Sequence, residues 1–226
     1  MASDRPGSPD DALPPRRRPR RRYAPGDETH KRILTAAVDH FSRFGYDRAS
    51  IAKIAADAGI SDTAVIHHFG TKQELFLATI DLREQPFMPV FAQLQSVREL
   101  FRQLVSSVRE SMQYPELVRF RAMLNGESLR ESNPARERMR SDMAGILAAL
   151  IPVFERGIAD GELKPNVDAR QAVLELLALN DGMRSQWATM PDEIDLPMIF
   201  EVAADALLAR ISSDGQGISK ISDENE

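Results

Sequence analysis

Short polar side chains and histidines crowd into one stretch of the chain, residues 61–69, with the sequence SDTAVIHHF. Ser61 is suited to cap a helix, because its hydroxyl can accept a hydrogen bond from a free first-turn N–H. Val65 and Phe69 point inward at i, i+4 spacing. The outer face then carries Asp62, Thr63, Ala64, His67 and His68. Short side chains let a helix approach base edges in the DNA major groove, so the pattern favours DNA reading; an ordinary helical hairpin is the alternative.

The residues just before this stretch must hold it in place, and they have the pattern of a short helix that ends in a turn. Ser50 is a second candidate N-cap. Apolar residues then recur at helical spacing, at Ile51, Ile54, Ala55 and Ala58. Gly59 follows, and glycine is best suited to the positive φ of a turn at a helix end. Residues 50–69 therefore predict a helix-turn-helix motif.

Amphipathic helices flank the motif on both sides. Upstream, THKRILTAAVDHFSRFGYDRAS predicts a helix that Gly45 ends. Its expected buried stripe consists of Ile33, Ala36, Ala37, Phe41 and Phe44. Downstream, Thr71 and Glu74 form a capping box at the start of a further helix. Three helices are therefore expected to pack together, and a fourth leads away.

Residues 29–81 resemble the DNA-binding domain of the TetR family of bacterial repressors. The matching segments, in order, are ILTAAVDHFSRFGYDRAS, SIAKIAADAGIS, HHF and TKQEL. The resemblance implies an all-α protein, with an N-terminal three-helix helix-turn-helix DNA-binding domain and a C-terminal helical ligand-binding and dimerisation domain. It also implies a homodimer that binds a double-stranded DNA operator and responds to a small-molecule effector.

The resemblance further assigns roles to single residues. It implies that Thr63, Ala64 and His67 face base edges, and that Ser50, His68 and Lys72 contact phosphates. Ser61 is then mainly the helix cap, and Arg48 lies within reach of the DNA backbone.

The contact face departs from the family pattern at three positions. The family usually has glycine where this chain has Thr63, a backbone-contacting tyrosine at Ile66, and a basic or polar residue at Asp62. The Asp62 carboxylate favours the positive N-terminal end of the helix dipole, or alternatively accepts a hydrogen bond from cytosine. Ile66 either turns toward the core or meets a thymine methyl group. One expected phosphate contact is therefore missing.

Positive charge is concentrated near the start of the chain, although the whole chain carries a net charge of −5. Residues 1–26 contain seven arginines against three aspartates. Six of these arginines form the run RRRPRRR: Arg16, Arg17, Arg18, Arg20, Arg21 and Arg22. Proline inside a run of like charges opposes folding, so we expect a disordered arm. Beside a DNA-reading domain it would add salt-dependent affinity; a solubilising tail is the alternative.

The composition argues against several other classes of protein. The absence of cysteine excludes disulfides, thiolate catalysis and cysteine-ligated zinc. Adjacent His67 and His68 diverge by about 100° on a helix and cannot chelate one ion, so no metal and no cofactor is expected. With four histidines and no glycine-rich phosphate loop, the chain is not expected to be an enzyme. Without an apolar run of about 18 residues, we expect a cytoplasmic protein with no membrane contact.

The rest of the chain has a helical pattern throughout, over about 90–113, 115–131, 134–159, 168–190 and 196–211. The last two segments are apolar enough for the dimer interface that the resemblance implies, or they close the core of one subunit. Methionine and aromatic residues fill cores and adaptable pockets alike. The ligand-pocket candidates are Phe91, Phe101, Met112, Phe120, Met123, Met183 and Trp187.

Four segments follow from these features: a disordered arm over 1–26, a DNA-binding domain over 27–84, a helical regulatory and dimerisation domain over 85–211, and a disordered acidic tail over 212–226. They predict a ligand-responsive transcriptional regulator, with repression as the expected sign, that binds a near-palindromic operator as a homodimer. The alternative is a helical interaction module that has lost specific DNA binding, because Asp62 and Ile66 weaken the contact face.

Overall fold

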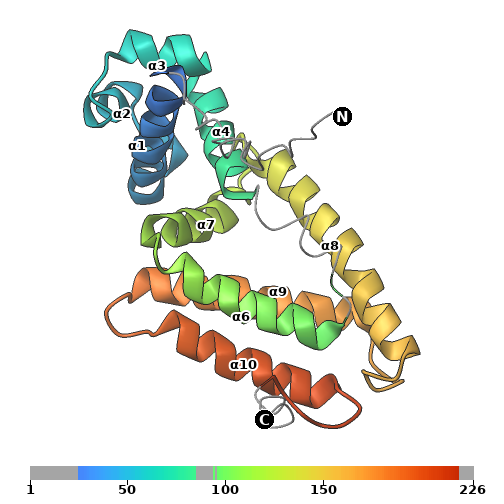
Figure 1. Ribbon diagram of the computed structural model, residues 1–226. Coiled ribbons are helices and arrows are strands. Elements are labelled where there is room, and N and C mark those ends of the chain that lie inside the picture. The colour runs from blue at the N-terminus through green and yellow to red at the C-terminus, as the bar shows by residue number, and fades with distance from the viewer. Residues whose placement is uncertain (1–24, 85–93, 95, 219–226) are drawn as a thin grey trace, which may run out of the picture.

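A computed structural model describes residues 25–84, 94 and 96–218, and this part of the chain contains nine helices (Figure 1). The helices are α1 Pro25–Arg48, α2 Ile51–Asp57, α3 Asp62–Phe69, α4 Lys72–Glu84, α6 Val97–Ser111, α7 Pro115–Glu127, α8 Arg136–Ala159, α9 Ala169–Thr189 and α10 Leu196–Ile211. Outside the helices, one isolated antiparallel bridge joins Leu163 to Ser212. The predicted all-α class is confirmed.

Helices α1 to α4 form an N-terminal unit around one apolar core (Figure 1). The fully buried side chains of Phe41, Ile54, Val65 and Phe76 come one from each helix. The rings of Phe41 and Phe76 meet edge to face, with their centroids 4.8 Å apart. Helices as short as α2 and α3 are marginal alone, so packing against α1 and α4 stabilises them.

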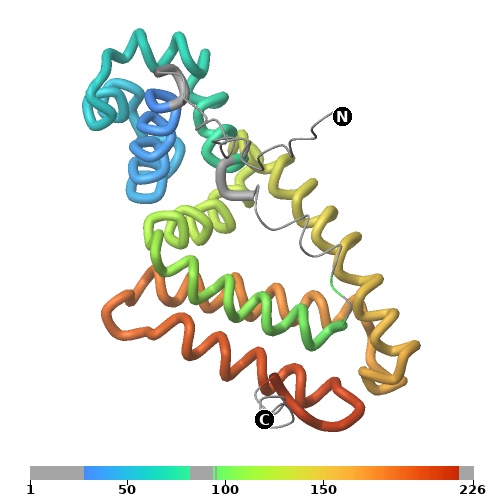
Figure 2. The backbone as a smooth tube through the Cα atoms, in the orientation of Figure 1, coloured from blue at the N-terminus to red at the C-terminus, as the bar shows by residue number. Residues whose placement is uncertain are grey.

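Helices α6, α9 and α10 lie alongside one another in a C-terminal unit, and α8 flanks α9 (Figure 1). Their core includes the buried side chains of Phe101, Phe154, Trp187 and Phe200. Figure 2 shows α8 running from the region of α4 to the far end of this bundle. Near the start of α8, Arg138 forms an ion pair with Asp81 of α4.

Helix α7 belongs to both units. Its Val118 packs in the C-terminal core, whereas Phe120 and Leu124 are fully buried in the N-terminal core. The Phe120 ring meets that of Phe76 edge to face at 6.1 Å. Since α7 presents apolar side chains to two cores, it fastens one unit to the other.

The end of α7 also meets a break in α1. Gly45 has φ 71° and ψ 175°, a conformation that is essentially restricted to glycine. There the Tyr46 N–H donates a hydrogen bond to the Glu127 carboxylate at 3.0 Å, and a Cβ on Gly45 would overlap Glu127 Oε1. The sequence predicts that the helix ends at Gly45; the structure has a break there, and α1 continues beyond it to Arg48.

Two helix starts in the C-terminal unit differ from prediction. α6 begins at Val97 rather than near residue 90, because the Ser96 side chain caps it by accepting the Glu99 N–H at 3.1 Å. α8 begins at Arg136 rather than at residue 134, because Asn133 caps a turn there by accepting the Ala135 N–H at 2.9 Å.

Two further predictions at helix ends also need correction. α7 ends at Glu127, four residues before its predicted end at 131. Phe44, which periodicity places in the buried stripe of α1, is 45% exposed. It lies beside the His40 ring, with centroids 5.6 Å apart, at the edge of the N-terminal unit. Periodicity gives the direction of a side chain but not the position where the core ends.

Residues 212–218 fall within the predicted disordered tail, but they pack against α6 and α10. The buried Arg98 guanidinium donates to the Gly217 carbonyl at 3.0 Å and to the Asp214 carboxylate at 2.8 Å. The Gln216 N–H and then Arg98 hold the pKa of the Asp214 carboxyl below its usual value. Asp205 accepts the Ile218 N–H at 2.6 Å. The C-terminal unit therefore extends to residue 218, and residues 219–226 lie outside the described part.

Replacement of Gly45 by alanine should destabilise the protein. The substitution forces a Cβ into a glycine-only conformation and against Glu127, so we expect a loss of about 1–3 kcal/mol in the free energy of unfolding. Urea unfolding measures the change. Gly126→Ala is the matched control, because a Cβ at this helical position meets nothing within 4 Å and should be neutral or stabilising. Equal stability of the two variants would contradict the role of the break.

Candidate nucleic-acid interface

The turn between α2 and α3 has the predicted chemistry. Gly59 has φ 67°, and a Cβ there would lie 2.8 Å from the Arg32 guanidinium, which hydrogen-bonds the Ala58 carbonyl. The Ser61 hydroxyl caps α3 by accepting the Ala64 N–H at 3.1 Å. The fully buried Val65 then anchors α3 in the core. Local capping and one apolar anchor therefore set the orientation of α3.

The outward face of α3 carries the side chains expected to read DNA. Thr63, His67 and His68 are exposed and Ala64 is half-buried, whereas Phe69 packs against the core. No described segment covers the exposed side chains of this face. The structure therefore leaves one surface of α3 accessible over its whole length.

The two unusual residues of α3 also face outward. The Asp62 carboxylate accepts the Thr63 N–H at 2.9 Å, so it satisfies a free donor at the positive end of the helix. This geometry favours the helix-terminus role over a base contact. Ile66 is 44% exposed, which excludes the predicted alternative in which it turns toward the core.

The residues expected to contact phosphates come from three elements around α3. Ser50 occupies the N-cap position of α2, but its side chain makes no capping hydrogen bond, which leaves the hydroxyl available. Arg48 is exposed at the end of α1. Lys72 donates to the Asp47 carbonyl at 3.1 Å and lies 4.6 Å from the Tyr46 ring centroid. Burial and the Asp47 charge raise the pKa of Tyr46, so its hydroxyl stays neutral at neutral pH.

Two histidines that the sequence pattern does not single out lie at this site. His30 of α1 stacks on Phe69 with ring centroids 4.4 Å apart, and it meets His68 edge to face at 6.4 Å. The buried His40 bonds Asp57 of α2 through Nε2 at 2.5 Å. Neither contact leaves a signal in the sequence, because each joins residues that are far apart along the chain.

The arginine arm lies outside the described residues, so the placement of Arg16, Arg17, Arg18, Arg20, Arg21 and Arg22 stays a prediction. Phe91, the first of the ligand-pocket candidates, also lies outside them.

The other ligand-pocket candidates do not gather in one place. Phe101, Met112, Met183 and Trp187 belong to the C-terminal core or pack against it, and the Arg119 guanidinium lies 5.2 Å from the Trp187 ring centroid. Phe120 and Met123 instead belong to the N-terminal cluster. The periodicity of α7 alone does not reveal this division, because α7 contacts both cores.

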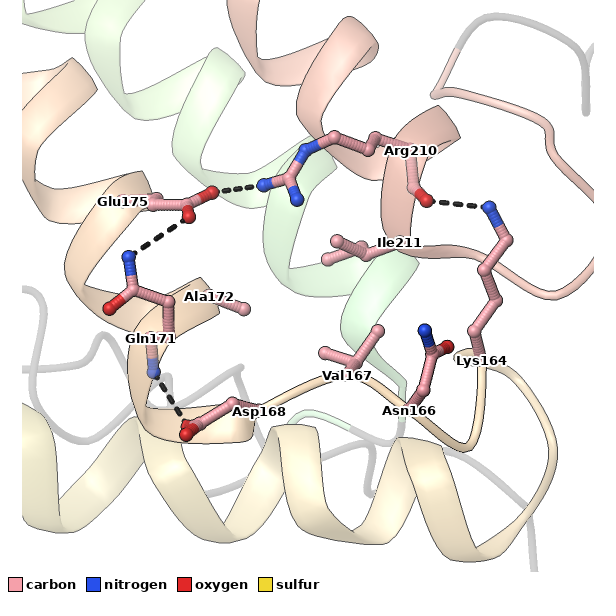
Figure 3. A pocket seen from close by; sticks show the side chains of 9 residues that line it. All are labelled: Lys164, Asn166, Val167, Asp168, Gln171, Ala172, Glu175, Arg210 and Ile211. Carbon is pink, nitrogen blue, oxygen red and sulfur yellow. Dashed lines mark hydrogen bonds and ion pairs between the residues drawn. The ribbon is translucent and has the colours of Figure 1, made fainter.

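A surface pocket of about 310 Å³ lies between the start of α9, the end of α10 and the segment before α9 (Figure 3). Val167, Ala172 and Ile211 form its apolar part. Its charged groups bond to one another: Arg210 pairs with Glu175, and the Arg210 carbonyl accepts a hydrogen bond from Lys164 Nζ at 2.6 Å. None of the six ligand-pocket candidates in the described part of the chain lines it. The pocket therefore does not coincide with the predicted effector site.

No group of three or more histidine or acidic side chains among the described residues is arranged to hold a metal ion. No described helix is both long enough and apolar enough to span a membrane.

Comparison with known proteins agrees with the geometry of α1 to α4. Residues 33–79 match the family described as bacterial regulatory proteins, tetR family. The transcriptional regulator SrpR of Pseudomonas putida is 27% identical over 172 residues, which cover 74% of this chain and 81% of SrpR.

Solved structures extend the similarity to the C-terminal unit. NalD, the secondary repressor of the MexAB-OprM multidrug efflux pump in Pseudomonas aeruginosa, aligns with a TM-score of 0.69 and 25% identity over 83% of this chain and 98% of NalD. SmeT in complex with triclosan aligns with a TM-score of 0.71 and 25% identity over 83% of this chain and 93% of SmeT. The helix-turn-helix geometry and these similarities together show that residues 33–79 form a tetR-family DNA-binding domain, in a chain that is similar to known transcriptional regulators over most of its length.

Proposed function

We propose that the chain is a ligand-responsive repressor that binds a near-palindromic operator as a homodimer. The observation that carries this proposal is the exposed face of α3. Thr63 and His67 are exposed there, while the Ser61 cap and the buried Val65 hold the helix in place. Such a face suits contacts with base edges in the major groove. We also propose that this regulator is cytoplasmic. It acts by binding DNA and so has no enzymatic activity.

The proposed dimer uses α9 and α10. Leu174, Met198 and Val202 are large apolar residues exposed on these helices, and Val202 is 66% exposed. Ala178 and Leu207 line a shallow apolar groove between the same helices. Apolar residues exposed together favour burial against a second copy. Two recognition helices related by a twofold axis and about 34–36 Å apart would read both halves of a near-palindrome.

The proposed effector binds the C-terminal unit and acts through α7. Two similar proteins point to this kind of control: NalD is a repressor of an efflux pump, and SmeT has been solved with triclosan. A ligand shifts the DNA-binding equilibrium only by its differential affinity for the two conformers. Arg121 of α7 forms an ion pair with Asp181 of α9 at 3.1 Å, so a ligand that displaces α9 would also displace α7.

A mobility-shift assay of the full chain on DNA that flanks its own gene tests the operator proposal. Specific retardation that survives competitor DNA is expected at low salt. The alternative, an interaction module without specific DNA binding, predicts that binding disappears when residues 1–26 are removed. A regulator keeps its sequence preference without them. Retardation of all DNA fragments alike would overturn the operator proposal.

Changes on α3 and changes in the arm should have different effects on DNA binding. Thr63→Ala or His67→Ala should alter sequence preference, because these side chains are expected to face base edges; the expected change is about 1–3 kcal/mol for each lost pairing. Alanine at the six arginines of residues 16–22 should weaken binding to all sequences and flatten the salt dependence. Fluorescence anisotropy over a salt series separates the two effects. A loss of sequence preference in the arm variant would contradict these assignments.

Charge placed on the proposed dimer face should produce monomers. In Val202→Asp, a carboxylate would be buried without a partner at the interface, so we expect the dimer to dissociate at micromolar concentration. Light scattering coupled to size exclusion measures the mass. Leu129→Asp is the matched control, because Leu129 is 79% exposed in the turn after α7, away from α9 and α10, and should leave the dimer intact. A Val202→Asp variant that remains dimeric would contradict the proposal that this face forms the interface.

A further inference from the structure

Three of the four histidines in the chain gather at one edge of α3. His67 and His68 are neighbours in the last turn of the helix, with ring centroids 6.0 Å apart. His30 of α1 stacks on the Phe69 ring, and this places its ring centroid 6.4 Å from that of His68. All three histidines are exposed. The structure therefore makes a surface cluster, the His30–His67–His68 edge, from two separate segments of the chain.

Among the side chains that the structure describes, the charged groups on the surrounding helices provide no carboxylate that pairs with this edge. These groups are Glu28 and Lys31 on α1, Lys53 and Asp57 on α2, Asp62 on α3, and Lys72 and Glu74 on α4. Asp57 bonds His40, Asp62 accepts the Thr63 N–H, and Glu74 bonds Thr71. Lys72 bonds the Asp47 carbonyl. Glu28 is exposed two residues before His30, and no ion pair joins it to the edge among the described residues.

The fourth histidine differs in every respect. His40 is 6% exposed, lies between α1 and α2, and bonds the Asp57 carboxylate, while its Nδ1 is buried without a hydrogen-bond partner in the described part of the chain. It belongs to the scaffold of the motif. Among the four histidines, three are therefore exposed to solvent and can take up a proton on DNA binding, whereas His40 is enclosed.

We propose that the His30–His67–His68 edge is a proton-dependent DNA-binding site, with His30 and His68 on phosphates and His67 beside them at the base edges, so that affinity for DNA increases as the pH falls. This inference rests on the proposed DNA-binding function. Imidazole changes its charge between about pH 5 and 8, and a bound phosphate stabilises the protonated form. Residues 27–84 carry seven Lys/Arg and nine Asp/Glu, a formal charge of −2, which three protonated histidines would change to +1.

The His68 ring centroid lies 6.4 Å from that of His30 and 6.0 Å from that of His67, so these neighbouring imidazoles repel one another when they are charged, and no described carboxylate pairs with them. DNA phosphates relieve this repulsion, so DNA binding takes up protons. By linkage, a lower pH then strengthens DNA binding.

Fluorescence anisotropy of the full chain tests the proposal, with DNA that flanks its own gene and with a random duplex, at pH 6.0 and pH 8.0 over a salt series. Binding should be tighter at pH 6.0. The slope of log Kobs against log salt should steepen by about 0.9 for each additional phosphate that the protein neutralises, up to about 1.8 for the two phosphates of His30 and His68. The triple variant H30Q/H67Q/H68Q should bind equally at both pH values. Arg43→Gln, which removes an exposed cation elsewhere on α1, should retain the pH effect.

A second variant separates charge from shape. In H67K/H68K the charge is permanent, so the affinity at pH 8.0 should approach that of the native chain at pH 6.0. Circular dichroism at both pH values checks that each variant is folded. Native binding that is equal at pH 6.0 and 8.0 overturns this inference and leaves the proposed function standing. A pH effect that persists in the triple variant assigns the proton to another group, such as His40, and also overturns it. Absence of DNA binding at both pH values overturns both proposals.

Discussion

The hydrogen bond from the Tyr46 N–H to the Glu127 carboxylate joins the broken end of α1 to the end of α7. It forms where Gly45 lacks a side chain, so a carboxylate from α7 can reach a backbone donor inside α1. The same helix buries Phe120 and Leu124 in the N-terminal core. A polar contact and two apolar anchors thus hold α1 on α7. Since α2 and α4 pack on α1, this junction also fixes the N-terminal unit to α7.

Polar contacts between α1 and its neighbours help to position α3. His40 holds α2 through Asp57, and Arg32 holds the turn through the Ala58 carbonyl. Lys72 ties the start of α4 to the Asp47 carbonyl just beyond the break. Because α2 and α3 are too short to be stable alone, these contacts and Val65 set where α3 lies. A displacement of α7 would therefore reach α3 by way of α1.

This arrangement limits what the proposed effector has to do. A ligand need not contact the DNA-binding helices; it must bind more tightly when α7 holds one of two positions. To reverse an equilibrium from 1:99 to 99:1 takes a differential affinity of about 5.5 kcal/mol. Packed helices pass such a shift as a rigid displacement, because close-packed cores deform little. The ion pairs Arg121–Asp181 and Arg138–Asp81 join α7 to α9 and α8 to α4, so they lie along such a route.

Short-range patterns in the sequence determined most of the helices and their caps. Ser61 and Thr71 cap helices as predicted, and α10 spans the predicted 196–211, because capping and periodicity act over a few residues. The outward face of α3 follows from the same periodicity. The family resemblance also rests on these local signals, since its motifs are spaced segments of one domain.

Only the tertiary structure decided which distant residues meet. Phe120 has the pattern of a regulatory core residue but lies in the DNA-binding core, and Phe44 leaves the stripe where that core ends. The Tyr46–Glu127 bond joins residues 81 positions apart, and His30 reaches Phe69 from another helix. Local preferences orient a side chain on its own helix. The burial of apolar surface between helices then selects its neighbours, and this depends on the whole chain at once.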